Sequence, residues 1–246
     1  MRILWCVAIL AAGAAYGQEK QPGQGVNFFS REKEIALGQS LAAEESRHTT
    51  PLDSAAVNEY VRRVGAALAA AMPVVYSYEF HVIQEDSGGV THEPVAFPGG
   101  PIFVSQYLIA AAQNEAEFAG MLAHAMAHVQ ARHWTRQVTK AELSQVGWVA
   151  SGGQPVPLGQ IQFQRANERE ADFLAVRAMA AAGYDPAGLA SYIQRLQVPA
   201  ATVLATLPDR DQRTKDINQE IGTLPQRTYQ QDNQFARVKS ELKLLP

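Results

Sequence analysis

Two short motifs, forty residues apart, carry side chains that bind metal ions. His124 and His128 are four residues apart, and in an α-helix that spacing places both imidazoles on one face, about one turn apart. Glu168 and Asp172 repeat the spacing in the second motif. Two histidine nitrogens and one carboxylate oxygen are typical of a catalytic zinc site, which keeps an open coordination position. The sequence therefore predicts a site for one Zn²⁺ with His124, His128 and Glu168 as ligands.

Asp172 has a predicted role behind the metal. A histidine that ligates zinc usually donates its second ring N–H to a carboxylate, which fixes its tautomer, and we expect Asp172 to hold His124 in this way. Glu170 points away from the face that Glu168 and Asp172 share, so it is predicted to be a solvated charge. The alternative is that the segment is an ordinary charged helix face, on which Arg169 forms a local ion pair.

Two predicted helices must position these residues. Asn114 with Glu117 three positions later forms a capping-box pattern, which predicts the start of a long helix that carries both histidines. His133 follows His128 by five residues, about 140° further round such a helix, so it is predicted to make a structural hydrogen bond rather than to bind metal. The carboxylates lie on a helix from about residue 164 to 182, which Gly183 ends.

A short strand is predicted beside these helices. Two glycines, Gly99 and Gly100, stand between prolines in a turn before the apolar run Ile102, Phe103 and Val104. Since Pro101 cannot donate a ladder hydrogen bond, we expect this run to be an edge strand. An edge strand can bind an extended polypeptide by strand addition.

Length and composition favour one mostly helical α+β domain. The chain has 246 residues, 47% of them hydrophobic and 18% charged, so it can bury a sizeable core. Further helices are predicted over residues 31–47, 54–72 and 210–221, and a strand over 76–83. The formal net charge of −3 argues against nucleic-acid binding, which requires a basic surface. We assign residues 29–224 to the domain.

The chain ends have their own character. Residues 1–17 combine Arg2, an apolar stretch and small residues, which predicts a secretory signal peptide and export to the periplasm or beyond. The single cysteine, Cys6, lies within it. Residues 18–28 are polar and predicted to be a flexible arm, and residues 225–246 a polar, loosely held C-terminal tail. No other segment is apolar and long enough to span a membrane.

Four segments resemble the CAAX prenyl protease 1 and HtpX-like zinc metallopeptidases of peptidase family M48. They are the runs 114–133 and 167–172, the Phe97–Gly100 turn and the run 183–186. Family members are gluzincins, with an HExxH helix and a third ligand from a downstream ExxxD motif. The resemblance covers roughly residues 29–221 and implies a gluzincin-like fold with a small sheet, an active-site helix and a substrate-binding edge strand.

The chain departs from this pattern at two positions. Ala125 stands where the family has the HExxH glutamate, the general base for the attacking water. Leu207 stands where the family has a histidine before a proline, whereas the arginine six residues later is retained as Arg213. In the family that histidine and arginine are thought to stabilise the tetrahedral intermediate. A positioned general base contributes about 10²–10⁴-fold to the rate, so we expect zinc binding with little peptide hydrolysis.

Three functions follow from these patterns. The first is an impaired metallopeptidase, or pseudopeptidase, of the bacterial cell envelope that binds unfolded or extended polypeptide. The second is an active endopeptidase in envelope protein quality control that uses another base. Glu93, five residues before Pro98, is the candidate for that base, although the sequence favours a solvent-facing loop position for it. The third is a domain in which the metal is purely structural.

Overall fold

The computed structural model describes residues 25–73, 75–84, 93–151, 157–197, 208–229 and 233–243, with only the backbone given for 144–151 and 157–163. Along the described chain the elements are α1 (Arg31–His48), α2 (Ala55–Ala70), β1 (Glu79–Ile83), β2 (Val95–Ala96), β3 (Pro101–Ser105), α3 (Gln106–Ala111), α4 (Glu115–Gln130), α5 (His133–Ser151), α6 (Pro157–Ala182), α7 (Ala187–Leu196), α8 (Arg210–Thr223) and α9 (Gln234–Leu242). Helix predominates, which confirms the predicted α+β, mostly helical class. Among the described helices, none has the length and apolarity that a membrane crossing needs.

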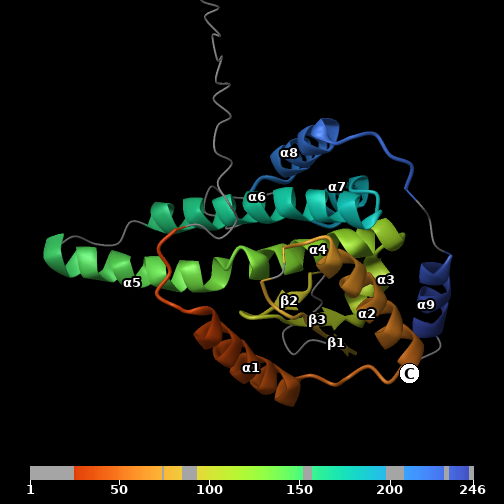
Figure 1. Cartoon of the computed structure of the whole chain (residues 1–246), viewed down its shortest axis with the longest axis horizontal. Helices are drawn as coiled ribbons and strands as arrows, with labels where there is room; N and C mark the ends of the chain where they lie inside the picture. Colours follow the sequence, from red (N-terminus) through yellow and green to blue (C-terminus); the bar gives the residue numbers. More distant parts are fainter. Residues whose placement is uncertain are drawn as a thin grey trace, which may run out of the picture.

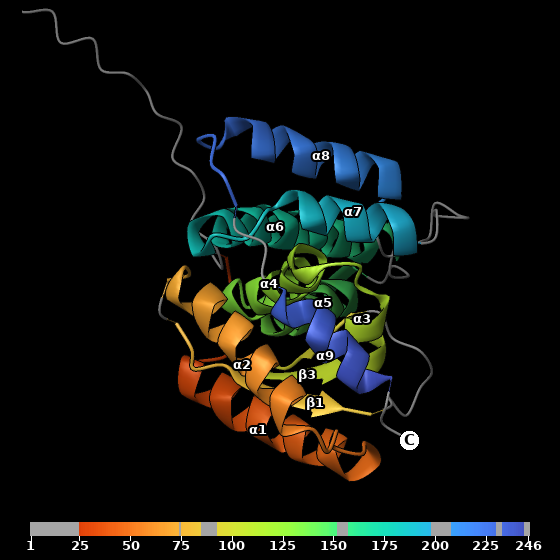
Figure 2. The same ribbon diagram turned by 90° about the vertical axis from the view of Figure 1, so that its right-hand side faces the viewer.

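Helix α4 is the centre of the molecule. Helices α6 and α7 lie on one side of it and the sheet with α2 on the other, while α8 and α1 form the two outer layers (Figure 1, Figure 2). All α4 residues except Ala116 and His128 are buried. Small residues allow this close packing, because a Cβ added at Gly120 would lie 3.0 Å from the Leu189 Cα of α7.

The predicted helix caps are present. The Asn114 side chain accepts a hydrogen bond from the Glu117 amide at 2.9 Å, and the Glu117 carboxylate accepts one from the Gln113 amide at 2.8 Å. Ser30 and Ser54 cap α1 and α2 in the same manner. These caps satisfy amide groups that a helix leaves without partners at its first turn. The start of the metal-site helix is therefore encoded locally.

The prediction that Ile102, Phe103 and Val104 form an edge strand is wrong. The sheet order is β1-β3-β2, so these residues lie in its central strand, which pairs parallel with β1 and antiparallel with β2. Every β3 residue is buried, as expected for an unbroken apolar run. Pro101 fits as the first residue of a strand, a place that suits proline in central strands too. The edge next to α4 is β2 (Figure 1).

The turn before β3 requires both glycines. Gly99 and Gly100 have φ angles of 79° and 132°, which side chains rarely allow. A Cβ at Gly100 would also lie 2.0 Å from the Ser77 carbonyl oxygen. Gly99 and Gly100 therefore shape the hairpin that joins β2 to β3.

The long helix predicted from Asn114 is interrupted. It stops at Gln130, and α5 starts at His133 after Arg132, which has a φ of 59°. The Arg132 guanidinium donates to buried Glu34 of α1 at 2.8 Å and to the Phe29 carbonyl at 2.5 Å. Tyr76 and Thr135 also hydrogen-bond to the Glu34 carboxylate. These contacts fix the corner between α4 and α5.

The described parts of both chain ends contact the rest of the molecule. In the polar tail 225–246, α9 buries Phe235 and Val238 against the core. In the arm, the backbone amide of Phe28 donates to the Thr139 hydroxyl at 3.0 Å, and the side-chain amide of Asn27 donates to the Thr135 hydroxyl at 2.9 Å. The predicted signal peptide, residues 1–17, lies outside the described residues.

Candidate metal centre

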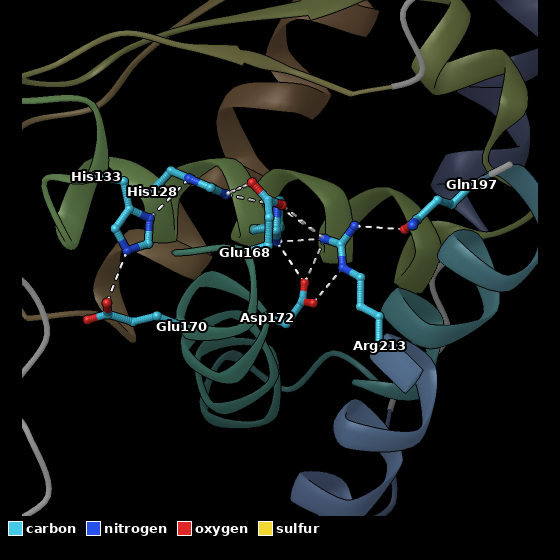
Figure 3. A network of polar contacts seen from close by, with 8 residues as sticks. His128, His133, Glu168, Glu170, Asp172, Gln197 and Arg213 are labelled. Carbon is cyan, nitrogen blue, oxygen red and sulfur yellow. Dashed lines mark hydrogen bonds and ion pairs between the residues drawn. The ribbon is translucent and has the colours of Figure 1, made fainter. Parts of the chain in front are cut away.

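The three predicted ligands converge. His124 and His128 come from α4 and Glu168 from α6, and their ligand atoms all lie within 4.8 Å of one another. The Nε2 atoms of the two histidines are 3.0 Å apart, and each is 3.4–3.5 Å from a Glu168 oxygen. Figure 3 shows Glu168 directed toward His128. The predicted ligands of α4 and α6 therefore lie where these two helices face each other.

Asp172 lies directly behind His124. Its Oδ1 atom is 2.9 Å from His124 Nδ1, so the nitrogen on the far side of the ring, Nε2, faces His128 and Glu168. Asp172 also accepts two hydrogen bonds from Arg213, at 2.6 and 2.8 Å. The geometry is that of a carboxylate that orients a metal-binding histidine.

Arg213 is buried beneath this pair rather than in the open part of the site. Its side chain is 1% exposed, and besides Asp172 it donates to the Gln197 side chain at 3.0 Å. Its Nη2 atom is 3.6 Å from Glu168 and 3.3–3.4 Å from the His124 ring nitrogens. Arg213 thus supports Asp172 behind the predicted ligands (Figure 3). Direct contact of Arg213 with a reaction intermediate stays a prediction.

His128 also has supporting residues behind it, which the sequence reasoning missed. Its Nδ1 atom is 3.0 Å from His133 Nδ1, and His133 Nε2 is 3.2 Å from Glu170. Arg136 also donates to Glu170, at 3.2 Å. The prediction that Glu170 is a solvated charge is therefore wrong, whereas the structural hydrogen bond predicted for His133 is present. The break at Arg132, which has no sequence signal, brings His133 back onto His128.

The site favours positive charge. Burial opposes protonation of His124, but its hydrogen bonds with Asp172 and Glu168 raise its pKa to about 9. Burial also opposes ionisation of Glu168, but its bonds to His124 and His128 hold its pKa far below the usual range. In the metal-free protein the two carboxylates thus favour the imidazolium form of His124, which carries a proton on both ring nitrogens. Two imidazoles and an ionised carboxylate at this spacing fit Zn²⁺, which would displace one of these protons.

A cavity of about 310 Å³ opens in front of the ligands. Its walls include His124, Ala125, His128 and Glu168, together with Glu93 from the strand side. Burial lowers the pKa of Arg213, but Asp172 and then Glu168 raise it above its usual value, and the charge of exposed Glu93 adds to theirs. Glu93 therefore faces the site and solvent at once. Leu207 lies outside the described residues.

Among the described residues of this cavity, three carry carboxylates: Glu34, Glu93 and Glu168. Glu34 is 1% exposed and is held by Arg132 and its neighbours. Glu168 is directed at the two histidines. Ala125, one residue after His124, contributes only a methyl group, so Glu93 is the remaining candidate for an acid or base.

Two comparisons relate the chain to known proteins. The chain is similar to the beta-barrel assembly-enhancing protease of Yersinia pestis, with 26% identity over 86% of this chain and 49% of the relative. It is also similar to the protease of that name from Escherichia coli strain K12, with 22% identity over 95% of this chain and 55% of the relative. The chain thus spans about half the length of these curated relatives. The family model of Peptidase family M48, a family of zinc metallopeptidases, matches residues 51–221. The chain therefore belongs to peptidase family M48.

Proposed function

We propose that this chain binds one Zn²⁺ through His124, His128 and Glu168 and holds extended polypeptide in front of it without efficient hydrolysis. Bound there, Zn²⁺ would supply Lewis-acid polarisation of a peptide carbonyl. Asp172 and Arg213 keep His124 in the orientation that zinc requires. The observation that carries the proposal is the methyl group of Ala125 at the cavity wall, beside both histidines.

Alanine removes the group that proton transfer needs. Peptide hydrolysis requires a base for the attacking water and an acid for the leaving amine, and the methyl group of Ala125 supplies neither. Such a group contributes about 10²–10⁴-fold to the rate. The site keeps its ligands and their supports, so zinc and polypeptide binding do not depend on the lost carboxylate.

The strand that receives the polypeptide is β2, in place of the central strand that sequence reasoning favoured. The Phe97 amide, next to β2, donates to the carbonyl of Pro101 in β3 at 2.9 Å. Phe97 and Pro101 are therefore a hydrogen-bonded pair of the antiparallel ladder. Hydrogen-bonded and non-hydrogen-bonded pairs alternate along an antiparallel ladder, so Ala96, opposite Ile102, directs its N–H and C=O away from β3. Ala96 also lines the cavity, which places this edge, unpaired among the residues that the structure describes, beside the predicted metal ligands.

Removal of one amide tests the strand. Ala96→Pro deletes the outward N–H, at an edge position where proline is tolerated, and Ala96→Val keeps it. We expect the proline variant to bind unfolded casein several-fold more weakly than the valine variant, with equal zinc contents. Equal casein binding by the two variants would contradict strand addition at β2.

The runner-up is an active endopeptidase that uses Glu93. Its position in the wall of the same cavity favours this alternative. Casein cleavage by the zinc-loaded wild type separates the two functions, because the first predicts cleavage close to the chelator-treated background. Cleavage that chelator abolishes and Glu93→Gln removes would establish the runner-up instead.

We further propose that the protein is exported and acts in envelope protein quality control. The support is the apolar N-terminal segment and the similarity to proteases named for enhancing beta-barrel assembly. Fractionation of cells that express the tagged full chain tests the location. Recovery in the periplasmic or secreted fraction, shortened at the N-terminus, is the expected result, and full-length protein in the cytoplasm contradicts it.

A further inference from the structure

His128 is supported by a row of polar groups that zinc ligation alone does not explain. The row runs from His128 through His133 to Glu170, with distances of 3.0 and 3.2 Å, and Arg136 closes it at 3.2 Å from the same Glu170 oxygen. His133 is 3% exposed. Figure 3 shows the His133 ring between His128 and Glu170, with one nitrogen directed at each.

The contacts define which nitrogen carries each proton. His128 Nε2 faces His124 and Glu168, so for metal binding it must be unprotonated and Nδ1 must carry the hydrogen. That hydrogen points at His133 Nδ1, which must therefore accept. The proton of His133 then sits on Nε2, where the Glu170 carboxylate accepts it. Every nitrogen in the row has a partner, and one tautomer of each ring satisfies them all.

We infer that His133 and Glu170 are positioning residues for His128, in a role equivalent to that of Asp172 for His124. The inference rests on the proposed zinc site and adds to it. Each ligand histidine is then backed by a carboxylate, directly for His124 and through a second imidazole for His128. Such partners fix the ring orientation and raise the basicity of the ligand.

The fold has a specific way to build this row. Arg132 turns the chain with a φ of 59°, and α5 starts at His133 beside Glu170 of α6 (Figure 3). Since Glu34 holds Arg132, helix α1 contributes to the position of His133. By contrast, the surface pair of His48 and Glu44, at 3.0 Å, has more than half of each side chain exposed and lies outside the site.

The experiment separates the two contacts of His133. Asparagine places a polar atom near the Nδ1 position, next to His128, and glutamine places one near the Nε2 position, next to Glu170. We compare His133→Asn, His133→Gln and His133→Phe with the wild type, and use His48→Phe as the control for loss of an imidazole. The readouts are zinc affinity against a competing chelator, the absorption spectrum of the Co²⁺-loaded protein, and the melting temperature of the metal-free protein.

The expected result is a 10–100-fold loss of zinc affinity in His133→Phe, the range typical of lost ligand partners. His133→Asn should recover more affinity and more of the wild-type Co²⁺ spectrum than His133→Gln, with similar metal-free melting temperatures. His48→Phe should bind zinc as the wild type does.

Two results would overturn the inference alone: wild-type zinc affinity in His133→Phe, or no advantage of His133→Asn over His133→Gln. If His133→Phe does not fold, the comparison of the other two variants decides. A wild type that binds no zinc would instead overturn the proposed function and, with it, this inference.

Discussion

Replacement of Asp172 by asparagine should weaken both the fold and the metal site. The aspartate forms two hydrogen bonds with buried Arg213 and one contact with His124, and the variant keeps its shape while it removes the charge. Removal of one partner of a buried ion pair costs about 3–5 kcal/mol. Glu168, 3.6 Å from Arg213, remains as an anion nearby, so the lower end of that range applies.

The expected magnitudes are measurable. A loss of about 3 kcal/mol lowers the melting temperature of a protein of this size by about 6–12 °C. Zinc affinity should fall about 10–100-fold, because His124 loses the charged acceptor that fixes its tautomer. Thermal unfolding with chelator measures the first effect, and zinc competition with a chromophoric chelator measures the second.

The control for charge removal is Asp53→Asn, at an exposed position before α2, which should change neither quantity. An unchanged melting temperature in Asp172→Asn would refute the buried-pair reasoning. Unchanged zinc affinity would refute the orienting role of Asp172, whatever the melting temperature shows.

Three further predictions concern other parts of the structure. His128→Ala should abolish stoichiometric zinc binding by metal analysis, and equal bound zinc in variant and wild type would contradict the ligand assignment. Gly188→Ala should destabilise the protein by about 1–3 kcal/mol in urea, because its Cβ would lie 2.4 Å from a backbone carbon of α4. Gly222→Ala, with open space around it, should stabilise by up to about 1 kcal/mol, and equal effects of the two would refute the packing argument. Glu34→Gln should lower the free energy of unfolding in urea by about 1.5–3 kcal/mol, because Arg132 loses its charged acceptor. No change would show that the turn between α4 and α5 does not depend on the Glu34 charge.

The residues of the candidate metal site could be predicted from sequence because their geometry is local. A spacing of four residues on a helix fixes a shared face, and capping by Asn114 marks where that helix starts. Asp172 followed from the same periodicity, and its contact with His124 is present. These features depend on neighbours within one or two helical turns.

The features that were missed depend on tertiary contacts. The turn at Arg132 is stabilised by Glu34, 98 residues away in sequence, and this turn brings His133 to His128. The central position of β3 depends on partners on both sides, which Pro101 does not reveal. The tail carries Phe235 and Val238, whose burial against the core is not evident in a polar segment.

The most direct test of the central claim restores the missing carboxylate. Ala125 lies in the cavity wall with both histidines in place, so Ala125→Glu should gain chelator-sensitive casein hydrolysis of about 10²-fold or more over the zinc-loaded wild type, the contribution of one general base. The double variant with Leu207→His should exceed it. Robust zinc-dependent cleavage by the wild type, or no gain in either variant with zinc bound, would contradict the account.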